Sequence, residues 1–164
     1  MSLCFRRSHE TVPRSDASVE SGTLAAVWGK AMKRYVILYI ATLLVIAPLD
    51  ALWLGVIARG FFKNQLGDIL GDLKVLPAVL FYLMYVAGIM VFANGSDGAT
   101  WRSALGYGLL FGFFAYATYD LTNLAILRHW TWPAAAMDIA WGSLVTGVAA
   151  AVGLLIADAL GRPA

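Results

Sequence analysis

The sequence predicts an all-α fold: a bundle of four transmembrane helices with a short interfacial helix between the first two spans. Hydrophobic residues make up 60% of the 164-residue chain and charged residues only 13%, whereas soluble domains carry about 25% charged residues. The apolar residues gather in four long runs, and crossing a bilayer takes about 20 residues of helix. The runs lack the alternation of a β-barrel. The expected partner is therefore a lipid bilayer.

Each predicted span is expected to be helical, because open backbone has no hydrogen-bond partners in lipid. Residues 58–74 are too polar to span, but Phe62 and Leu66 recur there at helical spacing, which predicts the interfacial amphipathic helix. Pro133 is well placed to open the last helix. The four spans are predicted at Tyr35–Ile57, Val75–Ala93, Ser103–Leu127 and Ala134–Ala157.

Two parts of the chain are expected. Residues 33–160 form the four-helix membrane domain. Residues 1–32 form a polar, disordered N-terminal extension, because they are rich in Ser, Arg and Glu and lack an apolar stripe. Met32, followed by two basic residues and an apolar run, also resembles the natural start of a membrane protein. Lys and Arg are more numerous on the side that holds both termini, which predicts cytoplasmic termini.

Composition excludes several classes of function. The net charge of +2 is small and dispersed, so no nucleic-acid partner is expected. One cysteine, Cys4, and two histidines cannot form an internal disulfide, a zinc–thiolate site or a histidine-rich metal centre. The sequence has no phosphate loop, zinc-protease motif or nucleophile elbow. No metal ligand is therefore predicted, and the cofactor is left open.

Three aspartates, Asp50, Asp120 and Asp138, lie inside the apolar runs. A carboxylate at the bilayer centre costs about 2.5–3.5 kcal/mol on insertion scales. From their positions along the spans, all three lie roughly 6–11 Å below the same membrane surface at 1.5 Å per residue. They are the predicted catalytic residues of one polar pocket, covered by the hairpin Arg128–Pro133.

Other polar and aromatic side chains share the helix faces of these aspartates. Tyr116, Tyr119, Asp120 and Asn123 follow the i, i+3, i+4, i+7 pattern of one helix face. The second span is expected to be a structural wall that contributes mainly Tyr82 and Tyr85. The predicted ligand-binding residues are Asn123, Tyr119, Tyr116, Trp53 and Trp141.

Several chemistries suit such a pocket. The carboxylates could share a proton, as a relay or a general acid/base pair does, or bind a hard cation through oxygen. They could also bind a basic or hydroxylated head group, with the tryptophans supplying stacking or cation–π contacts. A structural role competes with each, because interhelical hydrogen bonds contribute about 0.6 kcal/mol and Asp138 suits the start of a helix.

Four segments resemble an uncharacterised family of predicted bacterial inner-membrane proteins that carries only a domain-of-unknown-function label. The segments are Leu49–Gly55, Phe81–Tyr85, Ala115–Ala125 and Asp138–Gly142. The resemblance covers about residues 33–157. It implies a four-helix protein of the bacterial inner membrane and brings no established activity or ligand.

Three functions remain open from the sequence, and whether the protein is an enzyme is left undecided. The first is binding or processing of a small amphiphile or lipid head group, with Asp120 central, Asp50 and Asp138 as its partners, and Asn123 and Tyr119 orienting. The second is a proton- or cation-coupled transporter subunit, for which a homo-oligomer is expected because four spans are few. The third is a non-catalytic accessory protein of a membrane enzyme. The other halves of the spans show little matching polar stripe, which favours a site over a pathway.

Overall fold

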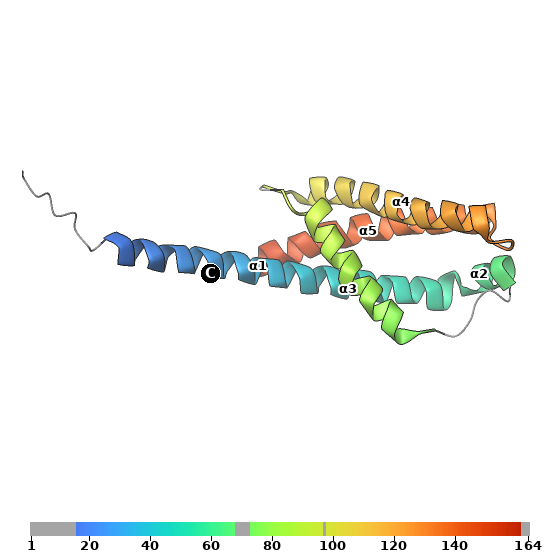
Figure 1. The fold of residues 1–164 in the computed structure, drawn as a ribbon, viewed down its shortest axis with the longest axis horizontal. Coiled ribbons are helices and arrows are strands. Elements are labelled where there is room, and N and C mark those ends of the chain that lie inside the picture. Colours follow the sequence, from blue (N-terminus) through green and yellow to red (C-terminus); the bar gives the residue numbers. More distant parts are fainter. Residues whose placement is uncertain (1–15, 68–72, 97, 162–164) are drawn as a thin grey trace, which may run out of the picture. The chain divides into compact units, whose positions relative to one another are not determined.

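The computed structural model describes residues 16–67, 73–96 and 98–161, and within these residues it contains helices and no strands. Four of the described helical segments are long and apolar enough to cross a membrane. The predicted four-helix fold is confirmed, as is the short helix between the first two spans, and the chain is a membrane protein that sits in a lipid bilayer. In order, the elements are α1 (Asp16–Leu52), the π-helical segment η1 (Trp53–Ile57), α2 (Arg59–Leu66), α3 (Val75–Phe92), α4 (Trp101–Ile126) and α5 (Trp132–Gly161) (Figure 1).

The chain divides into two compact units, Met1–Lys33 and Arg34–Ala164. Helix α1 begins at Asp16, so residues 16–32 are helical where composition predicted disorder. Residues 1–15 of the predicted extension lie outside the described residues. Helix formers in residues 16–32 offset the polar composition; they are Leu24, Ala25, Ala26, Lys30 and Ala31. The second unit contains the membrane bundle.

Local sequence explains where the helices of the bundle begin and end. Helix α4 starts after Thr100, whose side chain accepts a hydrogen bond from the Ser103 backbone N–H at 3.2 Å. The Ser103 hydroxyl oxygen in turn accepts one from the Thr100 backbone N–H at 2.8 Å. This reciprocal arrangement is a capping box. Helix α2 ends at Gly67, whose φ of 55° lies in the left-handed region that glycine adopts without strain.

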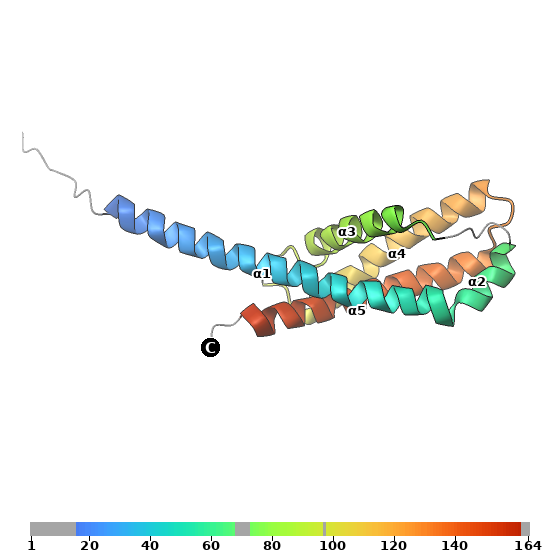
Figure 2. The ribbon, with the colours of Figure 1, turned by 90° about the horizontal axis from the view of Figure 1, so that it is seen from below.

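Helices α4 and α5 are antiparallel neighbours that lie side by side in both views (Figures 1 and 2). Their contact runs through glycines: a Cβ atom at Gly112 would lie 2.5 Å from the Gly142 carbonyl oxygen, and one at Gly108 would lie 2.9 Å from the Gly147 Cα atom. Gly153 makes a similar approach to Thr42 of α1. Small residues let membrane helices approach this closely. We call these five residues, Gly108, Gly112, Gly142, Gly147 and Gly153, the glycine seam.

The two ends of the bundle differ. At the hairpin end, residues 127–131 join α4 to α5, and α2 packs against the start of α5 through Phe62, Leu66 and Ala134. At the opposite end, which we call the Asp158 end, the Arg34 guanidinium pairs with the Asp158 carboxylate at 3.0 Å. This pair joins the first and last spans of the bundle.

Helix α1 is irregular near the hairpin end. Pro48 lies inside it, and η1 replaces the α-helical pattern from Trp53 onward. Proline removes one backbone hydrogen bond and clashes with the preceding turn, and π-helical turns are frequent at functional sites. Asp50 lies between these two irregularities.

Candidate functional site

Asp50 is buried and fully bonded. Only 3% of the residue is exposed. Its Oδ1 atom accepts a hydrogen bond from the Trp141 indole N–H at 2.7 Å, and Oδ2 accepts one from the Tyr82 hydroxyl at 3.1 Å. These bonds tie α1 to α5 and to α3. Asp50 therefore positions three helices around the site.

Asp120 is completely buried but only half bonded. Its Oδ1 atom accepts a hydrogen bond from the Trp130 indole N–H at 3.0 Å. Its Oδ2 atom is buried and has no partner among the described residues. Leaving a buried polar atom unpaired costs about 1–3 kcal/mol. This oxygen needs an explanation beyond the stability of the fold.

Asp138 lies in the second turn of α5 and is half-buried. It is within electrostatic range of both Asp120 and Asp50. The three carboxylates nevertheless do not converge on a point, because no three His, Cys, Asp or Glu side chains in the described segments are placed to hold one metal ion. The structure therefore brings the three aspartates into one region of the bundle, with separate partners for Asp50 and Asp120.

Two tryptophans stack beside Asp50. The rings of Trp53 and Trp141 are parallel to within 7°, with their centroids 4.3 Å apart. The Trp141 N–H bonds to Asp50, whereas the buried Trp53 Nε1 atom finds no partner within the part of the chain that the structure describes. The site thus holds an unpaired donor as well as an unpaired acceptor.

The polar face predicted on α4 divides in the structure. Tyr116 points into the bundle, where its ring occupies the space that a side chain at position 142 would take. Asp120 also faces inward. Tyr119 is 54% exposed and meets the Trp130 ring edge-on at 5.7 Å, and Asn123 lies near it, half-buried. Tyr119 and Asn123 therefore border the site from outside.

Three side chains outside the predicted site residues also make hydrogen bonds here, and two of them, Tyr82 and Tyr85, were expected as the main contribution of the second span. Tyr82, assigned to a structural wall, donates to Asp50. Tyr85 shares a hydrogen bond of 2.8 Å with Thr146 of α5. Trp130, in the hairpin, turns inward and donates to Asp120. The available clue was that the two tyrosines carry the only side-chain hydroxyl groups of the second span.

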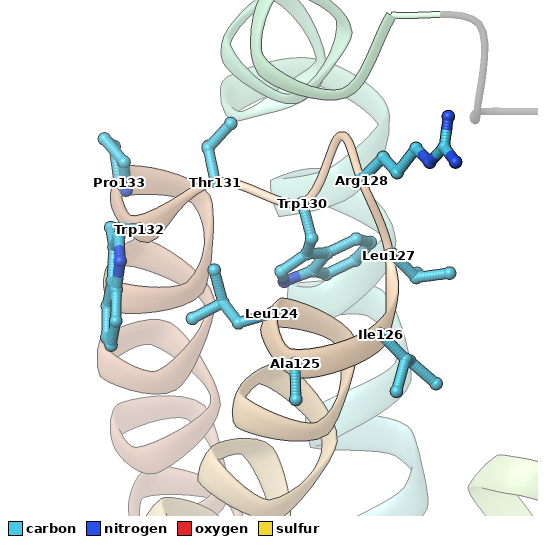
Figure 3. Close-up of a pocket in the computed structure, with 9 residues that line it drawn as sticks. All are labelled: Leu124, Ala125, Ile126, Leu127, Arg128, Trp130, Thr131, Trp132 and Pro133. Carbon is cyan, nitrogen blue, oxygen red and sulfur yellow. The ribbon is translucent and has the colours of Figure 1, made fainter.

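An open cavity of about 550 Å³ lies at the hairpin. Figure 3 shows the Trp130 ring beneath the hairpin, while Arg128 extends away from it. Trp130 both lines this cavity and donates to Asp120 Oδ1, so a single indole ring connects the cavity to the carboxylate whose other oxygen is unpaired. The lining residues are Leu124, Ala125, Ile126, Leu127, Arg128, Trp130, Thr131, Trp132 and Pro133.

Helix α2 holds the hairpin from the other side. The Thr131 hydroxyl donates to the Gln65 side-chain oxygen at 2.8 Å. Phe62 and Leu66 are buried together with Ala58 and Ala134, and both Trp53 and Trp130 pack against this cluster. Trp53, whose indole N–H is unpaired, and Trp130, whose indole N–H bonds to Asp120, therefore pack against the same apolar cluster.

Comparison with known proteins gives one family. A family model described as "Predicted membrane protein (DUF2177)" matches residues 35–155. No curated protein and no solved structure matches the chain. The matched region contains all three intramembrane aspartates and the whole hairpin.

Proposed function

The chain belongs to the DUF2177 family of predicted membrane proteins, and we propose that it binds or processes a small amphiphile such as a lipid head group. Asp120 is the central ligand or acid/base, with Asp50 and Asp138 as its partners. The observation that carries the proposal is the buried Asp120 Oδ2 atom, which has no partner among the described residues. Buried polar atoms are normally satisfied, so this one is suited to a hydrogen bond from a ligand.

The chemistry of the ligand follows from the two unpaired groups. Asp120 Oδ2 can only accept from a ligand when the carboxyl is ionised, and Trp53 Nε1 can only donate. A ligand hydroxyl or amine donates to the Asp120 carboxylate, and a ligand oxygen accepts from Trp53 Nε1. The head group is therefore hydroxylated or basic, and Trp53 and Trp141 offer aromatic faces to its carbon atoms or charge.

An amphiphile fits the surroundings of the hairpin cavity. Its rim carries exposed apolar side chains, including Ile126, Leu127 and Trp132. Tryptophan at such a position suits the level of lipid head groups. An alkyl chain can lie along these residues while its head group displaces Trp130 or reaches past it.

The remaining aspartates support this role in different ways. Both oxygens of Asp50 are already bonded, so Asp50 positions Trp141 against Trp53. Asp138 is half-buried and lies within electrostatic range of Asp120. In a processing reaction Asp138 would exchange the proton that Asp120 takes or gives.

Native mass spectrometry of the purified protein tests the proposal. The wild type is compared with Asp120→Asn and with Asp158→Asn, a matched control that removes the same charge from a half-exposed ion pair at the other end. We expect a small-molecule adduct on the wild type and on Asp158→Asn, and none on Asp120→Asn. Equal adducts on all three proteins, or none on any, would contradict a ligand held by Asp120.

The proposal places the protein in a bacterial inner membrane with both termini in the cytoplasm. Cys4 is the only cysteine in the chain, so a membrane-impermeant maleimide reports its side of the membrane. Cys4 should react only after the cells are permeabilised. In a Cys4→Ser background, His129→Cys in the hairpin should react in intact cells. The reverse pattern would invert the topology, and the native spectra would reveal any homo-oligomer.

A further inference from the structure

We propose that Trp130 determines the specificity of the Asp120 site, because it leaves the carboxylate one free oxygen and so favours an amine or a hydroxyl head group over a guanidinium. The inference rests on the proposed function and narrows the class of its ligand. The Trp130 indole N–H donates to Asp120 Oδ1 at 3.0 Å, while Oδ2 is buried without a partner among the described residues. Trp130 is thus a positioning residue that acts through Asp120.

Cationic head groups differ in how many carboxylate oxygens they use. A guanidinium is a planar fork, and two of its parallel N–H groups bond to both oxygens of a carboxylate. An ammonium is a compact point charge, and a hydroxyl donates a single hydrogen, so one oxygen is enough for either. With Oδ1 held by Trp130, a guanidinium at Asp120 loses one of its two bonds, whereas an amine or a hydroxyl loses none.

The burial of Asp120 makes the lost bond costly. The residue is completely buried, so the second N–H arm of a guanidinium would also be buried there, without an acceptor on this carboxylate. A buried donor that finds no partner carries the full cost of its desolvation. The site therefore discriminates against the forked head group, although both head groups carry the same charge.

Asp50 shows the same arrangement with both oxygens paired. One oxygen of Asp50 accepts from the indole N–H of Trp141, and the other accepts from the hydroxyl of Tyr82. Asp120 has the matching indole contact, from Trp130, but no described residue donates to its second oxygen. A single donor from a ligand would complete Asp120 in the way that Tyr82 completes Asp50.

The Trp130 indole is held in place from several sides. The Tyr119 ring meets it edge-on, with the ring centroids 5.7 Å apart, and the apolar cluster that includes Phe62 of α2 packs against it. The next residue, Thr131, is tied to α2 by its hydrogen bond to Gln65 at 2.8 Å. The ring lies beneath the hairpin (Figure 3). A ligand therefore reaches the second oxygen past a fixed indole ring and does not displace it.

Competition between two amphiphiles of equal chain length tests the selection. Dodecylamine and dodecylguanidinium, both cationic at neutral pH, are added in equal amounts, and native mass spectrometry gives the ratio of their adducts. We expect the wild type to favour the amine by about tenfold or more. Trp130→Phe keeps a ring but frees Oδ1, so the preference should fall by a similar factor. Trp101→Phe, an exposed tryptophan at the other end of α4, is the matched control and should keep the wild-type ratio.

The adduct ratio separates this inference from the proposed function. Both adducts form in one sample, so a lower yield of folded protein does not change their ratio, and the wild-type preference needs no variant to fold. Equal adducts on the wild type, or an unchanged preference in folded Trp130→Phe, would overturn the role of Trp130 and leave an Asp120-dependent ligand intact. If Asp120→Asn instead retains both adducts at wild-type levels, the proposed function fails, and this inference fails with it.

Discussion

The α4–α5 part of the glycine seam and the carboxylate site both involve α4 and α5, yet they differ in how completely their polar groups are paired. Along the seam the backbones touch, and a side chain at Gly112 would meet the Gly142 carbonyl. At the hairpin end, Asp120 Oδ2 and Trp53 Nε1 are buried without partners among the described residues. The seam is arranged for stability, whereas the site retains groups that cost stability, as functional sites do.

The glycine seam and the carboxylate site also differ in the regularity of their helices. Helices α4 and α5 are continuous through the seam. Helix α1 contains Pro48 and passes into the π-helical η1 where it meets the site. Irregular backbone in a membrane is tolerated where neighbouring protein satisfies it. The irregular turn places Asp50 and Trp53 together, and the regular helices hold them in position.

The largest effect should come from the seam. Gly112→Leu would drive a side chain into Gly142 and Thr146 and force α4 from α5, so we expect loss of folded protein. Gly106→Leu is the matched control on α4, because no atom within 4 Å would meet its Cβ. The yield of monodisperse protein in detergent measures both. Equal yields would refute the close contact.

A smaller loss of stability is expected when Asp50 loses one of its hydrogen-bond donors. Trp141→Phe removes the N–H that Asp50 Oδ1 accepts while retaining an aromatic ring. Hydrogen bonds to charged groups contribute about 1.5–3 kcal/mol, so the free energy of unfolding should fall by about that amount. Trp132→Phe, at an exposed tryptophan, should leave thermal unfolding unchanged. Similar losses in both variants would show that Trp141 acts through packing alone.

Substitution of Asp120 should raise the stability of the protein, whereas substitution in the glycine seam should lower it. Asp120→Asn keeps an oxygen for Trp130 and removes a charge from a fully buried position. If Asp120 is kept for a ligand, the ligand-free variant should be more stable by about 1 kcal/mol, as in other stability–activity trade-offs. Thermal unfolding of delipidated protein measures this. A marked loss would make Asp120 a structural residue.

The smallest change in stability is expected from breaking the ion pair at the Asp158 end. Arg34 and Asp158 are 44% and 41% exposed, and exposed ion pairs contribute about 0–1 kcal/mol. Arg34→Gln should therefore change the free energy of unfolding by less than about 1 kcal/mol, and less again in high salt. Unfolding at two salt concentrations checks this. A large, salt-independent loss would mean that the pair is buried in the membrane.

The spans could be predicted from the sequence because lipid imposes length and composition on them. The second was predicted at Val75–Ala93 and is Val75–Phe92, and the third at Ser103–Leu127 and is Trp101–Ile126. The four-residue spacing of Gly108 and Gly112 is typical of closely packed membrane helices, and the structure shows that close packing. Span length and glycine spacing are properties of a single helix, so they can be predicted without knowing how the helices pack.

The partners of the carboxylates could not be predicted, because they depend on how the helices rotate against each other. Tyr82 lies in an almost uniformly apolar span, where no stripe indicates its orientation. Trp130 lies in a hairpin at the end of two spans, where tryptophan usually lies at the membrane–water boundary, but it turns inward and donates to Asp120. Thr42, Asn94 and Thr146 are buried polar residues that come from different segments, so no pattern within a single helix indicates their burial.

The most direct test of the account is a comparison of head groups on the unpaired Asp120 oxygen. Dodecylamine, 1-dodecanol and dodecyl sulfate are titrated into protein in nanodiscs, and tryptophan fluorescence reports binding to the wild type, Asp120→Asn and Asp158→Asn. We predict that the amine and the alcohol bind the wild type and Asp158→Asn, and that Asp120→Asn weakens binding of the amine by about tenfold or more, since a charge-assisted hydrogen bond contributes about 1.5–3 kcal/mol. The sulfate has no donor and should bind poorly. Equal affinity of the amine for all three proteins, or tight binding of the sulfate, would contradict a donor-binding site at Asp120.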